Sequence, residues 1–179
     1  PIFAMVIRRI HEILDDCSVE VLIPDFKGSI EALKIVMDAR PEILNHNVES
    51  VPRLFKTIQP QSNYAVTEAT LVNAKKLYPN GLTKSGIMVG LGEEMDEVKE
   101  VMRDLRSWEV DILTIGQYLQ PSKKHLPIER FYMLEEFQEL EAYGKELGFK
   151  WVESGPLVRS SYHAAEQVRA LSEAFGEKQ

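Results

Sequence analysis

The chain has 179 residues, of which 44% are hydrophobic, and its formal net charge is −7. This length suits a single buried core, and the acidic balance argues against a nucleic-acid partner, because neutralising phosphates needs clustered positive charge. The sequence holds no run of about 18 apolar residues, so we expect no membrane-spanning segment, and one cysteine cannot build a disulfide framework.

Helical and strand-like patterns alternate along the chain. A helical spacing of apolar residues opens it at Ile7, Ile10, Ile13 and Leu14 and recurs over residues 98–105 and 134–147. Gly148 is a candidate C′ glycine of the last of these helices. Pro52 lies early in a short helix for which Glu49 or Ser50 is a candidate cap. Short apolar runs, typical of buried parallel strands, occupy residues 19–23, 43–47, 86–90, 110–115 and 149–152.

A helix followed by five β–α repeats predicts a mostly parallel sheet with helices outside it. Five strands are too few to close an eight-stranded barrel, so the choice lies between an open sheet and part of a larger barrel. The opening helix, with no strand before it, favours the second. We therefore predict an α/β fold of about five parallel β–α units in one domain, residues 1–179, with residues 59–63 as a loop between two helices.

The predicted ends of the strands are rich in polar residues and glycine. They are residues 24–26, 45–49, 90–93, 117–121 and 154 onward. Functional residues collect just past the carboxyl ends of parallel strands, so this succession predicts a site along one rim of the sheet.

The second of these strand ends carries Asn45, His46, Asn47 and Glu49. Strand alternation sends Asn45 and Asn47 to the same face, where amides can hydrogen-bond a ligand. The alternative is a polar turn in which Asn47 and Glu49 cap the next helix. A lone histidine such as His46 is more often a structural residue with satisfied hydrogen bonds than a ligand.

The third strand end combines Gly90 and Gly92, which allow close approach of the backbone to a ligand. The pattern is neither a dinucleotide fingerprint nor a Walker loop. Glu93 and Glu94 would repel a phosphate, so a neutral or zwitterionic ligand suits the loop better, and both also complement a helix dipole. Lys84, at the start of this strand, is a candidate partner for a carboxylate or a solvated lysine.

Two further strand ends complete the predicted rim. Gln117 and Tyr118 bring an amide and a phenol that suit a heteroaromatic ring, or simply form a turn ended by Pro121. The tail supplies Arg159, Ser160 and Ser161, whose serines are also candidate helix caps. Neither a Gly-x-Ser-x-Gly elbow nor a cysteine- or histidine-based metal motif occurs in the sequence.

Five blocks of the sequence, residues 19–26, 45–54, 83–93, 111–121 and 154–164, resemble in order the blocks of lipoyl synthases, which are radical S-adenosylmethionine enzymes. The resemblance implies that the fold is part of a (β/α)6 partial TIM barrel. It implies two 4Fe–4S clusters and S-adenosylmethionine as cofactors. The implied reaction begins with a 5′-deoxyadenosyl radical and inserts two sulfur atoms into a protein-bound octanoyl chain, forming a lipoyl group.

The resemblance also implies roles for individual residues. Asn45, Asn47, Glu49 and Lys84 would hold the ribose and methionine parts of the cofactor. Gly90, Gly92, Gln117 and Tyr118 would frame its adenine. Ser160, or as second choice Ser161, would ligate the auxiliary cluster beside Arg159, within a cluster-ligating tail and helix at residues 154–179.

The family's two cysteine triads are absent from this sequence, and we expect them to lie upstream of Pro1, so that the chain is the C-terminal half to two-thirds of the protein. Cys17 belongs to neither triad and is predicted to be a small buried apolar residue. The implied substrate is an octanoylated lipoyl domain or glycine cleavage H protein. A ferredoxin or flavodoxin is the implied reductant, and the bacterial cytoplasm, or an organelle matrix in a eukaryote, is the implied compartment. The alternative is a truncated, non-catalytic α/β fragment that binds a ligand or a protein.

Overall fold

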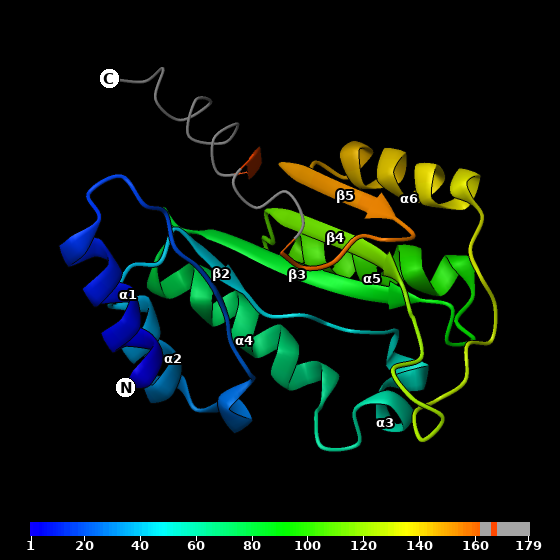
Figure 1. Ribbon diagram of the computed structural model, residues 1–179, viewed down its shortest axis with the longest axis horizontal. Coiled ribbons are helices and arrows are strands. Elements are labelled where there is room, and N and C mark those ends of the chain that lie inside the picture. Colours follow the sequence, from blue (N-terminus) through cyan, green and yellow to red (C-terminus); the bar gives the residue numbers. More distant parts are fainter. Residues whose placement is uncertain (162–165, 168–179) are drawn as a thin grey trace.

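The computed structural model describes residues 1–161 and 166–167. Its strands are β1 (Glu20–Leu22), β2 (Ile43–Asn45), β3 (Leu82–Val89), β4 (Ile112–Gln117) and β5 (Trp151–Gly155). They form one sheet in the order β1-β2-β3-β4-β5, and every pairing is parallel (Figure 1). The predicted α/β fold of about five parallel β–α units is confirmed.

Helices precede and connect the strands. They are α1 (Ile2–Ile13), α2 (Ile30–Met37), α3 (Phe55–Ile58), α4 (Tyr64–Leu77), α5 (Met95–Ser107) and α6 (Leu134–Glu146), with 3-10 turns at Phe26–Gly28 and Pro52–Leu54. Local chemistry fixes several ends: the side chain of Asn63 accepts from the amide of Ala65 at 2.9 Å at the start of α4. After α6, Gly148 takes a left-handed φ of +85°, as predicted for its C′ glycine.

The largest core lies between one face of the sheet and helices α5 and α6. Alternation along β3 and β4 turns Ile87, Val89, Leu113 and Ile115 to this face, where they pack against Val98, Val101, Met102, Leu105, Phe137 and Leu140. A second core joins α1 and α2 to β1. Lys84, Gly86, Thr114 and Gly116 alternate with these core residues and therefore face the other side of the sheet.

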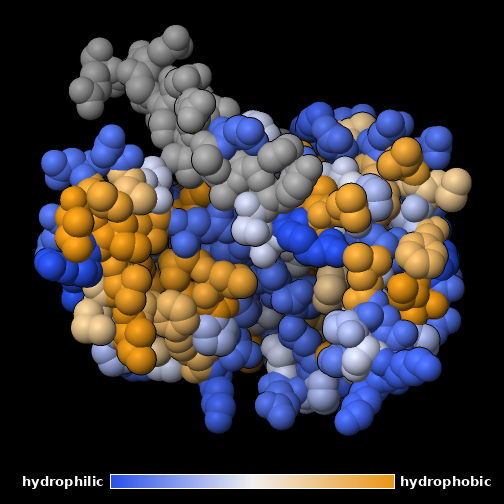
Figure 2. All heavy atoms as spheres, in the orientation of Figure 1, coloured by the Kyte–Doolittle hydropathy of each residue, from blue (hydrophilic) through white to orange (hydrophobic). Residues whose placement is uncertain are grey.

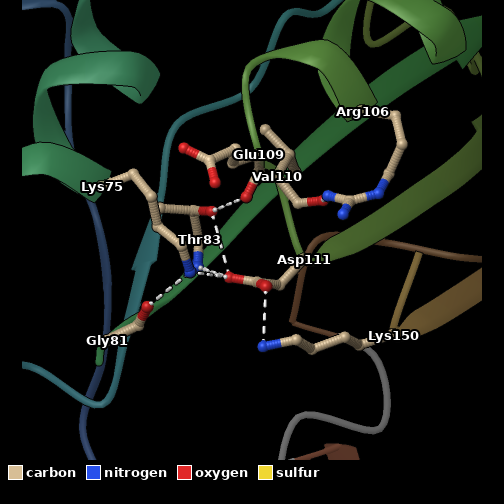
Figure 3. Close-up of polar contacts among 8 residues, drawn as sticks. All are labelled: Lys75, Gly81, Thr83, Arg106, Glu109, Val110, Asp111 and Lys150. Carbon is tan, nitrogen blue, oxygen red and sulfur yellow. Dashed lines mark hydrogen bonds and ion pairs between the residues drawn. The ribbon is translucent and has the colours of Figure 1, made fainter. Parts of the chain in front are cut away.

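A buried polar network ties the amino ends of β3 and β4 together (Figure 3). Asp111, 3% exposed, accepts from Lys75 Nζ at 2.6 Å, from Lys150 Nζ at 2.9 Å and from the amide of Thr83 at 2.9 Å. This network lies at the opposite end of the sheet from the polar strand ends, and we assign it to stability.

Several local predictions were wrong. β3 begins at Leu82, four residues earlier than predicted, because Thr83, Lys84 and Ser85 are buried polar residues that interrupt the apolar run. Cys17 is exposed rather than buried, because it lies in the irregular connection between α1 and β1. Neither Glu49 nor Ser50 caps the turn at Pro52, whose N-cap is Val51 without a side-chain bond.

The last strand also differs from its predicted bounds. β5 spans Trp151–Gly155 instead of residues 149–152, because its polar end continues the parallel ladder with β4. The loop predicted at residues 59–63 does connect two helices, α3 and α4. Within the described part of the chain, no helix has the length and apolar character needed to cross a bilayer.

Candidate functional site

Two neighbouring clefts lie along the carboxyl ends of the strands. The first cleft, of about 220 Å³, is lined from β3, β4 and the segments that follow β2, β4 and β5. Its lining residues are Asn47, Glu49, Gly86, Ile87, Met88, Thr114, Gly116, Gln117, Tyr118, Leu119, Pro121, Val158, Arg159 and Ser160. The second cleft, of about 600 Å³, is lined by Leu22, Ile23, Pro24, Asp25, Lys27, His46, Asn47, Glu49 and residues 59–62. Asn47 and Glu49 belong to both clefts.

Asn47 and Glu49 form the wall between the two clefts. Asn47 Nδ2 donates to Glu49 Oε1 at 3.2 Å, so the amide and the carboxylate act as one unit. Burial raises the pKa of Glu49, and the hydrogen bond from Asn47 partly offsets this. Glu49 holds a left-handed φ of +64°, a conformation that costs a residue other than glycine about 1 kcal/mol and is concentrated at functional sites.

The floor of the first cleft is shaped for a ligand group. Asn47 Oδ1 is buried and has no hydrogen-bond partner among the residues that the structure describes. A Cβ atom on Gly86 would lie 3.0 Å from this oxygen and 2.8 Å from Thr114 Oγ1, so the missing side chain keeps the space in front of both oxygens open. An unsatisfied buried acceptor beside open space fits a ligand that presents an O–H or N–H donor.

Gln117 and Tyr118 form the β4 side of the first cleft, as predicted. Gln117 Nε2 donates to the carbonyl oxygen of Arg130 at 3.1 Å, and its Oε1 accepts from the amide of Tyr132 at 3.0 Å. The Tyr118 hydroxyl donates to the carbonyl oxygen of Leu126 at 3.0 Å. Both side chains are thereby held in place, and they bind the following loop to the rim.

The tail brings Arg159 and Ser160 to the first cleft. The backbone of Val158 packs on Gly116, where a Cβ would lie 2.4 Å from the Val158 carbonyl oxygen. The Arg159 guanidinium donates to that same oxygen at 2.6 Å. Ser161 is exposed and does not line either cleft. The predicted tail and helix at residues 154–179 lies in part outside the described residues.

Gly90 and Gly92 do not line either cleft. The carboxylate of Glu93 instead accepts from the amides of Gly90 at 2.6 Å and Leu91 at 2.9 Å. Gly90, at φ +103°, is pressed against Gln117 and the carbonyl oxygen of Arg130. In this structure the glycine turn is filled by the chain's own side chains.

Asn45 and Lys84 lie beneath the clefts and meet at Glu20. Lys84, whose side chain is 0% exposed, donates from Nζ to Glu20 Oε2 at 3.0 Å and to Gln167 Oε1 at 2.9 Å. Asn45 Nδ2 donates to Glu20 Oε1 at 2.9 Å. The sequence offered a signal for Glu20, which is the one charged residue within the apolar run 19–23.

His46 is not the fully satisfied histidine that the sequence suggested. Its Nδ1 is 3.0 Å from the carbonyl oxygen of Ile23, which requires the proton on Nδ1. Nε2 is buried and has no hydrogen-bond partner within residues 1–161 and 166–167, and the ring lines the second cleft. Burial lowers the pKa of His46, although the Ile23 bond and the charge of Asp25 oppose that shift.

The described residues suit an organic cofactor better than a metal centre. The first cleft offers acceptors, amides and an open floor, which fit a polar ligand such as S-adenosylmethionine. By contrast, no group of three or more His, Cys, Asp or Glu side chains within residues 1–161 and 166–167 is arranged to hold a metal ion. The residues present therefore do not form a complete iron–sulfur site, and Ser160 Oγ can supply at most one ligand.

Comparisons with known proteins agree on one family. Residues 2–105 match the family model described as the Radical SAM superfamily. The chain is 55% identical over 167 residues to the lipoyl synthase of Rubrobacter xylanophilus, which covers 93% of this chain and 52% of that protein. It is 52% identical over 172 residues to the lipoyl synthase of Koribacter versatilis, and this match covers 96% of this chain and 57% of that protein. The chain thus spans about half the length of these curated relatives.

One solved structure, described as "QR15, an Aldolase", superposes on this chain with a TM-score of 0.54 at 15% identity, covering 96% of this chain and 71% of that one. At this identity the likeness shows a shared fold alone.

Proposed function

Because this chain belongs to the Radical SAM superfamily, we propose that it is part of a lipoyl synthase, which inserts two sulfur atoms into a protein-bound octanoyl chain. The observation that carries the proposal is the identity of about half of all residues to lipoyl synthases along nearly the whole chain. The five sequence blocks that resemble this family supply every lining residue of the first cleft and the residues directly beneath it, whereas the second cleft is lined in part by Lys27 and residues 59–62 outside these blocks.

We propose that S-adenosylmethionine binds in the first cleft. When bound beside a reduced 4Fe–4S cluster, this cofactor supplies the radical that removes hydrogen from unactivated carbons. Asn47 Oδ1 and the Glu49 carboxylate accept hydrogen bonds from its hydroxyl or ammonium groups, while Gln117 and Tyr118 frame its adenine. Asn45, Lys84, Gly90 and Gly92 are assigned to the same cofactor by resemblance, and they support the cleft from beneath and beside it.

We further propose that Ser160 provides the serine ligand of an auxiliary cluster, with Arg159 beside it. Both residues line the first cleft, whereas Ser161 does not. Two 4Fe–4S clusters, a ferredoxin or flavodoxin as reductant, and an octanoylated lipoyl domain or glycine cleavage H protein as substrate complete the proposal. We place the cluster cysteines in the part of the relatives' length that this chain does not span.

The cofactor site is tested with Asn47→Ala in the intact protein that contains this chain. Losing one buried acceptor should raise the dissociation constant of S-adenosylmethionine about tenfold, measured by calorimetry. The exposed turn residue Asn80 provides the matched control, and Asn80→Ala should bind as the wild type does. Equal affinities of the wild type and Asn47→Ala would place the cofactor elsewhere.

The serine ligand is tested with the neighbouring pair Ser160→Ala and Ser161→Ala. Iron content and lipoylated product should fall together in Ser160→Ala and stay at the wild-type level in Ser161→Ala. The reverse pattern would assign the ligand to Ser161. A folded intact protein that holds no iron and releases no 5′-deoxyadenosine would refute the enzyme and leave the non-catalytic fragment.

A further inference from the structure

The connection between β4 and α6, residues 118–133, is a long segment with neither helix nor strand. It starts inside the first cleft, which Tyr118, Leu119 and Pro121 line. It returns to the edge of the sheet where the amide of Glu129 donates to the carbonyl oxygen of Gly90 at 2.9 Å. Irregular connections longer than about 12 residues are uncommon in compact domains and are usually functional.

The segment has a fixed shape. Gln120 Nε2 donates to the carbonyl oxygen of His125 at 2.8 Å, and the Ser122 hydroxyl lies 2.9 Å from His125 Nδ1. The Tyr118 hydroxyl and the Gln117 amide group bind its two halves to the rim of the cleft. A surface that is ordered before binding loses less conformational entropy when a partner docks.

The tip of the segment carries uncompensated positive charge. Lys123 and Lys124 are exposed, and neither ammonium group has a hydrogen bond or ion pair within the described residues. Lys99, by comparison, pairs with Glu139 at 2.6 Å. In a chain with a net charge of −7, two adjacent free lysines create a local field that attracts an acidic surface.

Large apolar side chains are exposed in the same segment, at the start of α6 and after β5. Leu119, Phe131, Met133 and Leu134 are between 44% and 65% exposed, and Leu157, the neighbour in sequence of the cleft residue Val158, is 73% exposed. Figure 2 shows hydrophobic spheres interleaved with hydrophilic ones at the edge toward which the strands of Figure 1 point. Apolar residues with charges at the margin are the usual composition of a protein-docking surface.

We propose that residues 119–134 form the docking surface for an acidic protein domain that carries the acyl chain into the first cleft. The inference rests on the proposed function, because only a protein-bound substrate brings a second folded surface to the mouth of the cleft. Lys123 and Lys124 steer and orient the acidic carrier, and the apolar side chains hold it once it has docked. The reacting chain itself enters the cleft, where Leu119 and Pro121 lie, and does not contact Lys123, Lys124 or Phe131.

The test uses the intact enzyme with Lys123→Glu and Lys124→Glu combined. Steady-state kinetics are measured with an octanoylated carrier domain and with a short octanoyl-lysyl peptide that lacks the carrier fold. We expect KM for the domain to rise about tenfold and to lose most of its dependence on ionic strength, while kcat and both peptide constants stay unchanged. The control combines Arg8→Glu and Lys76→Glu, an equal charge change on α1 and α4, and should leave all constants unchanged.

A second variant, Phe131→Ser, removes apolar contact without changing charge. It should raise KM for the domain at every salt concentration and leave the peptide unaffected. Equal losses for domain and peptide would show that the segment serves the cleft itself and would overturn the proposal. Unchanged constants for the domain in both variants would also overturn it.

The docking surface and the proposed function fail in different ways. A wild-type enzyme that modifies neither substrate refutes the proposed function, whereas an active enzyme whose variants match the wild type refutes the docking surface alone. Lysine-dependent binding of a polynucleotide at physiological salt, without any effect on the carrier domain, would assign the patch to nucleic acid and overturn the proposal.

Discussion

Gly90 and Gly148 both have left-handed backbone conformations, with φ of +103° and +85°, but their surroundings differ. Around Gly148, no atom of the described residues lies within 4 Å of an added Cβ, so Gly148→Ala should lower the free energy of unfolding only by the backbone strain of about 1 kcal/mol. At Gly90 the same atom would lie 2.6 Å from the carbonyl oxygen of Arg130, and Gly90→Ala should cost about 3 kcal/mol. Denaturant unfolding of the intact protein measures both, and equal losses would contradict the packing seen at Gly90.

His46 should be neutral at physiological pH, with its proton on Nδ1. Its buried ring has a lowered pKa, so the unfolded chain binds a proton at a higher pH than the native protein does. Stability contributed at this site is therefore present above the ordinary histidine pKa of about 6.5 and is lost as the pH falls toward the native value. Titration of the ring by nuclear magnetic resonance checks this, and a pKa of His46 above the ordinary histidine value of about 6.5 would contradict it.

At the scale of elements, the Asp111 network joins the starts of β3 and β4 to α4 through Lys75. Asp111→Asn leaves Lys75 and Lys150 facing a neutral amide. We expect this substitution to lower the free energy of unfolding by about 3 kcal/mol at neutral pH. The native pKa of Asp111 lies below its ordinary value: burial, the largest effect, raises it, but the bonds from Lys75, Thr83 and Lys150 together outweigh burial. The stabilisation is thus full above about pH 4 and disappears as the pH falls through the native pKa.

The control for this variant is Asp38→Asn, which removes an exposed ion pair with Lys34. This substitution should lower the free energy of unfolding by about 0.5 kcal/mol or less. Thermal or denaturant unfolding between pH 2 and pH 7, in about unit steps, measures both variants across the titration range of carboxylates. A cost for Asp111→Asn that stays constant down to the lowest pH would contradict the assignment of the effect to its charge.

The element types could be predicted from the sequence because apolar period and length distinguish buried strands from amphipathic helices. The start of β3 could not be predicted from the sequence. Lys84 looks like a solvated residue there, because its partner Glu20 is distant in sequence. The surroundings of Gly90 could not be predicted either, because its amide donates to the carboxylate of Glu93 and not to a ligand. Local patterns thus located the rim of the sheet but not the pairing of its polar groups.

At the scale of the whole molecule, β1 is an edge strand that pairs only with β2 among the described strands. Exposed apolar side chains, among them Met5 and Leu22, lie on this side, where Figure 2 shows a broad hydrophobic area. We expect residues 1–179 produced alone to self-associate at micromolar concentration, because an uncovered edge invites pairing. Light scattering measures this.

Leu22→Lys should shift that equilibrium toward the monomer, whereas Leu157→Lys, at an exposed position away from β1, should not. A chain that remains monomeric at high concentration, or equal effects of the two substitutions, would contradict the role of this edge.

The position of the candidate site was predictable from the order of the strands, since all parallel strands end at the same edge. Asn47, Glu49, Gln117, Tyr118, Arg159 and Ser160 meet there as expected. The division of that edge into two clefts was not predictable, because it depends on where the loop at residues 59–62 packs.

The wall of Asn47 and Glu49 has a thermodynamic consequence. A ligand in one cleft that draws the Glu49 carboxylate toward itself withdraws the same group from the other cleft. The two occupancies are then linked, and whatever factor the first ligand imposes on the affinity of the second, the second must impose on the first. The affinity of each ligand can be measured once with the other cleft empty and once with it filled. The factor by which the affinity changes has to be the same for both ligands.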